Sequence, residues 1–131
     1  MPDLIADHEL VIITAPITDK TFGLVDKDFL AAMDDGALLV NAGRGQIVVT
    51  DALVEELQSG RIRAALDVTD PEPLPDDHPL RDCTNVIISP HVARTVPGTN
   101  TLVHRVQVDQ IGAFIRGEKP PNAVQATGLR A

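Results

Sequence analysis

Aromatic side chains and cysteine are scarce in this sequence. Its 131 residues include three Phe and neither Trp nor Tyr, so there is little material for a surface that stacks on bases or sugars. The single cysteine, Cys83, cannot form an internal disulfide. One thiol fits a reducing compartment, so we expect a cytoplasmic protein in which Cys83 is an inert thiol.

Positive charge and long apolar runs are also lacking. The chain has 11 Lys and Arg against 19 Asp and Glu, which gives a formal net charge of −8 at pH 7. This charge repels phosphate backbones and anionic membrane surfaces, so we expect no nucleic-acid partner. No apolar run approaches the ~20 residues that a membrane-spanning helix needs, and no export signal is recognisable at the N-terminus. We therefore expect no membrane partner.

The sequence contains several short apolar runs. Hydrophobic residues make up 44% of the chain, enough for one modest core. We predict four strands from the runs at residues 9–14, 37–41, 64–68 and 85–89. The first run reads Glu-Leu-Val-Ile-Ile-Thr, which is typical of a strand buried on both faces of a parallel sheet.

Helical patterns alternate with these strands. Asp26 is placed to cap a first helix, and Thr50 to cap a second that ends at Ser59 and Gly60. A long third helix is predicted from about Thr95 to a stop at Gly117. The alternation predicts an α/β fold, in which right-handed crossovers build a parallel sheet flanked by helices.

Polar side chains that follow the strands are the candidate site residues, because ligands of open α/β sheets bind outside the carboxyl ends of the strands. Arg44 follows the second run between two glycines, and Asp67 follows the third. Glu72 stands between two prolines, which restrict its backbone, and His91 follows the fourth run. Taken singly, Arg44 is more typical of a surface charge and Glu72 of a solvated acidic loop, and His91 could equally be a hydrogen-bonded core residue.

Two other motifs suggest different kinds of site. The segment 43–48 begins like the glycine-rich turn G-x-G-x-x-G, with Asp67 as the ribose-binding acid, but its third glycine is replaced by Val48. A zinc site of His78, Cys83 and His91 is conceivable, but the separations match no usual structural-zinc pattern. We therefore predict no metal site.

Four segments in order resemble the D-isomer-specific 2-hydroxyacid dehydrogenases. The family's Leu-Pro-Leu-Thr-x-x-Thr, Asn-x-x-Arg-Gly, Leu-Asp-Val with a downstream Glu-Pro, and Asn-Val-Ile-x-x-Pro-His are matched here by residues 15–21, 41–45, 66–73 and 85–91. The resemblance implies a partial Rossmann-like NAD-binding domain with a long helix near the C-terminus. It divides the chain into 1–94, the C-terminal half of that domain, and 95–131, a connecting helix and tail.

The resemblance also implies roles for individual residues. Arg44, Glu72 and His91 would be the catalytic trio: Arg44 would hold the carboxylate of a small 2-keto or 2-hydroxy acid, and His91, hydrogen-bonded to Glu72, would exchange the proton. Asp67 would contact the nicotinamide carboxamide. The cofactor, NAD with NADP not excluded, would lie against these residues: Ala15, Ala42, Gly43, Arg44, Asp67 and His91.

The sequence also departs from the family. Thr14 stands where many members have His, and Thr69 where Phe is common. The glycine-rich turn and most of the substrate domain have no counterpart here, so we expect a truncated and inactive enzyme, with the missing N-terminal half or a second copy as partner. A non-catalytic binding module or a fragment without function are the alternatives.

Overall fold

The protein is described from a computed structural model that defines residues 5–92 and 99–120. It divides into two compact units, residues 1–91 and 92–131, and each is described by itself. The expected start of the last helix at Thr95 and the tail beyond residue 120 lie outside the described residues.

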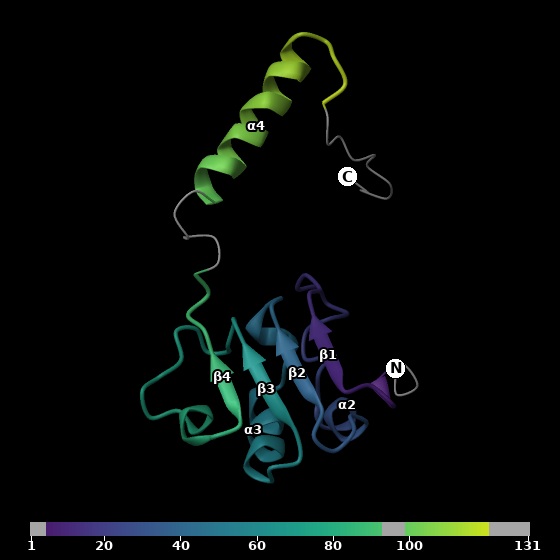
Figure 1. Ribbon diagram of the computed structural model, residues 1–131, viewed down its shortest axis with the longest axis vertical. Helices are drawn as coiled ribbons and strands as arrows, with labels where there is room; N and C mark the ends of the chain where they lie inside the picture. The colour runs from purple at the N-terminus through teal and green to yellow at the C-terminus, as the bar shows by residue number, and fades with distance from the viewer. Residues whose placement is uncertain (1–4, 93–98, 121–131) are drawn as a thin grey trace. The chain divides into compact units, whose positions relative to one another are not determined.

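The first unit contains a four-stranded parallel sheet in the order β1-β2-β3-β4 (Figure 1). The strands are β1 (Leu10–Ile13), β2 (Leu38–Asn41), β3 (Arg63–Leu66) and β4 (Val86–Ile88). Ile13, Asn41, Leu66 and Ile88 occupy one row across the sheet. The predicted α/β fold is therefore confirmed, and all four strands end along the same edge.

Two short helices accompany this sheet. Helix α2 (Lys27–Ala31) begins after Asp26, whose side chain accepts a hydrogen bond from the Phe29 N–H at 2.9 Å, as predicted. Helix α3 (Thr50–Gln58) has Val49 rather than Thr50 at its cap, so that prediction was wrong. The Thr50 hydroxyl instead donates to the carbonyl of Asp70, a partner 20 residues away in the sequence.

The core lies on one face of the sheet. Leu39, Ala64 and Leu66 are buried together with Leu30 of α2 and Leu53 of α3. Side chains alternate along a strand, so the intervening residues point to the opposite face.

That opposite face is largely uncovered within the described residues. Ile12 of β1 and Ile87 of β4 lie in one row and are 54% and 73% exposed, and Leu10 is 49% exposed. The expectation that the first strand is buried on both faces was therefore wrong. A short apolar run does not distinguish a strand covered on one face from a strand covered on both, and the described residues cover β1 on one face.

The second unit contains α4 (Thr99–Ile115), which confirms the predicted long helix. Gly117 follows it with a φ of 72°, the left-handed conformation that ends many helices. Apolar side chains of α4 are widely exposed, with Phe114 at 75% and Ile115 at 77%. None of the described helices has the length and apolar character to cross a membrane.

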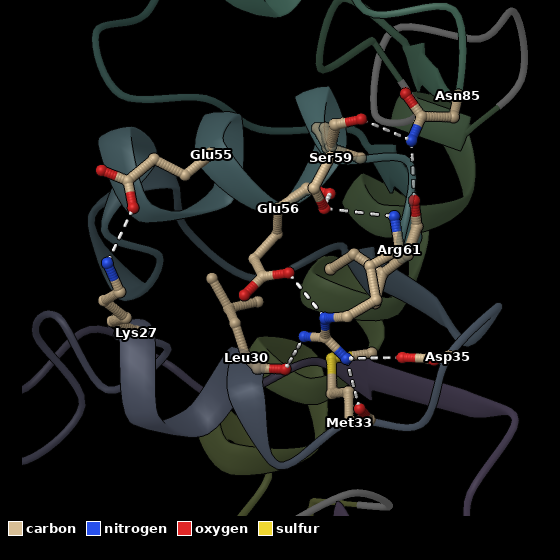
Figure 2. Close-up of polar contacts among 11 residues, drawn as sticks. Lys27, Leu30, Met33, Asp35, Glu55, Glu56, Ser59, Arg61 and Asn85 are labelled. Atoms are coloured by element: carbon tan, nitrogen blue, oxygen red, sulfur yellow. Dashed lines mark hydrogen bonds and ion pairs between the residues drawn. The ribbon is translucent and has the colours of Figure 1, made fainter.

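Arg61 ties the turn after α3 to the end of α2 (Figure 2). Its guanidinium donates to the carbonyls of Leu30 and Met33, both at 2.6 Å, and to the Glu56 carboxylate at 2.7 Å. The Glu56 carboxylate raises the pKa of Arg61 further above its ordinary value. The guanidinium thus adds a second donor to the Leu30 carbonyl, which already accepts from the Met33 N–H, and supplies a donor to the Met33 carbonyl just beyond the helix.

We predict that Arg61→Met lowers the free energy of unfolding by about 2 kcal/mol, because three hydrogen bonds of a charged group are lost and Glu56 and the Met33 carbonyl lose this donor. Urea denaturation measures the change. The exposed pair of Lys27 and Glu55 provides the control (Figure 2): Lys27→Met should leave the midpoint unchanged. Equal midpoints for both variants would contradict this role of Arg61.

Candidate active site

Polar side chains gather at the carboxyl ends of β3 and β4. Asp67 directly follows β3 and Ser89 directly follows β4. The neighbouring strands pair in register at Leu66 and Ile88, so the next residue on each strand lies opposite the other. The Ser89 hydroxyl accordingly donates to Oδ1 of Asp67 at 2.6 Å.

The predicted Glu72 and His91 are in direct contact. Nδ1 of His91 lies 2.7 Å from Oε1 of Glu72. A carboxylate only accepts, so Nδ1 carries the hydrogen of this bond and Nε2 is the ring nitrogen left for a ligand. His91 has a φ of 52°, a left-handed conformation that is uncommon outside glycine and turns the chain sharply at this residue.

These residues line one pocket of about 680 Å³, which we name the β3–β4 pocket. Its walls include Asp67, Thr69, Glu72, Ser89, Pro90 and His91. The volume is within the range of pockets that hold small ligands and parts of cofactors. The side chains of Glu72 and His91 are each a little over two-fifths exposed, so the pair is accessible from solvent.

The loop that carries Glu72 is anchored at several points. The hydroxyl of the buried Thr69 donates to the Pro71 carbonyl at 2.8 Å, and the Thr50 hydroxyl holds the Asp70 carbonyl at 2.8 Å. Farther along, Arg81 donates to the carbonyls of Leu74 and Pro75. These side-chain hydrogen bonds thereby hold a proline-rich segment that is not paired in the sheet.

Arg44 is positioned by a buried asparagine. The side chain of Asn41, 1% exposed, accepts from the Gly43 N–H at 3.1 Å and donates to the Arg44 carbonyl at 3.0 Å. This turn leaves the Arg44 side chain exposed, with Nη1 donating to the Gly43 carbonyl at 2.7 Å.

The two glycines beside Arg44 permit close backbone contacts. A Cβ at Gly43 would lie 2.8 Å from the Ala15 carbonyl oxygen, and a Cβ at Gly45 would overlap the Thr69 carbonyl. Gly45 therefore packs the Arg44 turn against the start of the loop that carries Glu72.

A second pocket of about 340 Å³ lies at the ends of the first two strands, and we name it the β1–β2 pocket. Its walls include the predicted residues Ala15, Ala42, Gly43 and Arg44, together with Thr14. The structure thus places Glu72, His91 and Asp67 around one pocket and Arg44 in the wall of the other.

The sequence motifs gave no site role to Ser89 or Arg81, and they marked Thr69 only as a departure from the family. All three line the β3–β4 pocket. Ser89 could have been found only from the strand register, because its partner is 22 residues away. The hydroxyl of Thr69 and the guanidinium of Arg81 act on backbone carbonyls, for which the sequence carries no signal.

Within the described part of the chain, no group of three or more His, Cys, Asp or Glu side chains is arranged to hold a metal ion. Cys83 is half-buried, and burial raises the pKa of its thiol above the ordinary value, with Asp82 adding to the effect. A thiol held in its protonated form is a weak nucleophile.

Together, the parallel sheet and the polar pockets at its carboxyl edge define an open α/β domain of the kind that binds ligands at its strand ends, with a hydrogen-bonded carboxylate–histidine pair in one pocket. The model for "D-isomer specific 2-hydroxyacid dehydrogenase, NAD binding domain" matches residues 1–93. The chain therefore belongs to the D-isomer-specific 2-hydroxyacid dehydrogenase family, as the sequence motifs indicated.

Named relatives support this assignment. The glyoxylate reductase/hydroxypyruvate reductase of Homo sapiens is 37% identical over 125 residues, which cover 95% of this chain and 38% of the human protein. Glyoxylate/hydroxypyruvate reductase B of Serratia proteamaculans is 40% identical over 128 residues, covering 97% of this chain and 39% of the relative. This chain thus spans about two-fifths of the length of these relatives.

Solved structures show the same fold. A D-isomer specific 2-hydroxyacid dehydrogenase from Xanthobacter autotrophicus Py2, in complex with NADPH and MES, has a TM-score of 0.80 and 35% identity, over 95% of this chain and 51% of that one. The D-mandelate dehydrogenase of Rhodotorula graminis has a TM-score of 0.84 and 27% identity, over 97% and 37% of the two chains.

Proposed function

We propose that this chain is the part of an NAD-dependent D-2-hydroxyacid dehydrogenase that holds the nicotinamide and exchanges the substrate proton. The contact between Glu72 and His91 is the single observation that carries the proposal. A histidine whose Nδ1 is engaged by a carboxylate has a fixed ring orientation and one free nitrogen, which is the arrangement of an acid–base catalyst.

His91 is the proton donor in reduction and the proton acceptor in oxidation. Glu72 holds the ring so that Nε2 is presented to the substrate oxygen. Arg44 binds the substrate carboxylate, for which a guanidinium offers two parallel N–H donors. Because Arg44 borders the β1–β2 pocket and His91 the β3–β4 pocket, we propose that the substrate lies between these two residues.

The cofactor is a nicotinamide dinucleotide, and the residues present fit it. The β3–β4 pocket offers a carboxylate acceptor, Asp67, beside His91. The β1–β2 pocket is lined by small residues, Ala15, Ala42 and Gly43, which let a ligand approach the backbone. When bound, the nicotinamide supplies or accepts the hydride. Solved relatives are in complex with NADPH or with NAD, so we leave both forms in the proposal.

The substrate is a small 2-keto or 2-hydroxy acid. Relatives named glyoxylate and hydroxypyruvate reductases make glyoxylate and hydroxypyruvate the first candidates. We propose a cytoplasmic enzyme with neither nucleic-acid nor membrane partners, which acts with the remaining part of such an enzyme or as a homo-oligomer. A non-catalytic module is the second candidate, and the wide exposure of Ile12 and Ile87 on the uncovered sheet face favours it as a surface for a partner.

We predict that the 131 residues alone bind NADH weakly and do not oxidise it with glyoxylate, hydroxypyruvate or pyruvate. The reason is that the sequence has no complete glycine-rich turn to bind the pyrophosphate. NADH absorbance measures turnover, and amide chemical shifts at Asp67 and His91 report binding. Robust turnover by the 131 residues alone, if it is abolished in His91→Ala, would contradict the proposal that this chain needs a further part of the enzyme for activity. Absence of any shift in either pocket at saturating NADH would contradict the proposed function.

A further inference from the structure

Ser89 makes the hydrogen bond that orients Asp67. The hydroxyl of Ser89 donates to Oδ1 of Asp67 at 2.6 Å, and both side chains line the β3–β4 pocket with His91. Asp67 is half-buried and Ser89 is exposed. None of the roles proposed for Arg44, Glu72 and His91 involves Ser89, which nevertheless contacts a carboxylate of the same pocket.

The fold itself does not depend on this hydroxyl. The Asp67 N–H donates to the Asn41 carbonyl at 3.0 Å, and the Ser89 N–H donates to the Leu66 carbonyl at 2.9 Å. Both backbones are therefore held by extensions of the sheet ladder. The Ser89 hydroxyl fixes the rotation of the Asp67 carboxylate, because it donates to one of the two carboxylate oxygens and leaves the other oxygen for a ligand.

We infer that Ser89 is a positioning residue that fixes the Asp67 carboxylate so that its second oxygen accepts an N–H from the carboxamide of the nicotinamide ring. The inference rests on the function proposed above. An ionised carboxylate only accepts hydrogen bonds, so it suits the amide and repels a carboxylate at the same position. The pair of Ser89 and Asp67 thereby distinguishes the amide form of the dinucleotide from its acid form.

The test uses the full 131-residue chain and two probes, NAD⁺ and nicotinic acid adenine dinucleotide, with affinities taken from amide chemical shifts of pocket residues. The unsubstituted chain should bind NAD⁺ about ten-fold more tightly than the acid form. Ser89→Ala should weaken NAD⁺ binding about five-fold, since one orienting hydrogen bond is lost, and should leave the affinity for the acid form unchanged. Ser89→Thr should restore the preference, because it returns a hydroxyl.

Ser59→Ala is the matched control, since its hydroxyl donates to the Glu56 carbonyl and does not line the pocket. That variant should bind both probes as the unsubstituted chain does. The inference is overturned if Ser89→Ala binds NAD⁺ normally, or if it loses affinity for both probes equally, as a structural defect would. If the unsubstituted chain shows no chemical-shift changes with either probe, the proposed function is contradicted, and the inference with it. That outcome is distinct from failure of the inference alone, because it is seen without any substitution.

Discussion

His91→Gln is expected to lower kcat on the order of 10³-fold in a hybrid enzyme, the usual scale for loss of a general acid–base. In the hybrid, this chain replaces the 128-residue matching segment of the Serratia proteamaculans reductase, which supplies the rest of the cleft. Glutamine preserves the size and polarity of the side chain but cannot exchange a proton. Steady-state oxidation of NADH with glyoxylate measures the loss.

Two further variants make this result specific. Glu72→Gln keeps a side chain that can meet Nδ1 of His91 but removes the negative charge, so kcat should fall less than in His91→Gln while the KM for NADH stays unchanged. His8→Gln is the control, because His8 is exposed, does not line either pocket, and its Nδ1 lies 2.8 Å from the Ala6 carbonyl oxygen. A normal kcat in the His91→Gln hybrid would show that His91 does not transfer the proton.

Gly45→Ala is expected to lower the free energy of unfolding by about 3 kcal/mol, a value typical of overpacking against a rigid neighbour. The new Cβ would overlap the carbonyl of Thr69, which is backbone and cannot rotate away. The loop must then shift, and it carries Glu72 away from His91. Urea denaturation measures the loss.

Gly112→Ala is the matched control for this substitution. Gly112 lies in α4, and among the described residues a Cβ there would meet the end of the flexible Arg116 side chain, at 3.2 Å. Alanine also favours the helix over glycine. The control should therefore keep or raise the stability, and equal losses in the two variants would contradict the proposed role of Gly45.

The strands were predictable because each is a short apolar run bounded by polar or turn residues. The cap at Asp26 was also predictable, since a capping contact spans only three residues. The cap at Thr50 was not, because its hydroxyl is used by Asp70, which only the folded chain brings near. The exposure of Ile12 and Ile87 was equally unpredictable, because a strand of branched apolar residues has the same sequence pattern whether one of its faces is covered or both are.

The candidate site was predictable in part. Strand ends indicated where polar residues gather, but Glu72 and His91 became a pair only through the family resemblance, because 19 residues separate them. The bond between Ser89 and Asp67 needed the register of β3 and β4. Contacts that depend on register or on a proline-rich loop belong to tertiary structure, and local sequence patterns do not encode them.

The measurement that tests the account most directly is NADH oxidation by the unsubstituted hybrid with glyoxylate or hydroxypyruvate. We predict turnover that approaches that of the parent Serratia reductase, because in our proposal this chain supplies the catalytic residues Arg44, Glu72 and His91. A hybrid that folds and binds NADH as tightly as the parent, yet does not oxidise it with either acid, would contradict the claim that this chain carries the catalytic residues of a 2-hydroxyacid dehydrogenase.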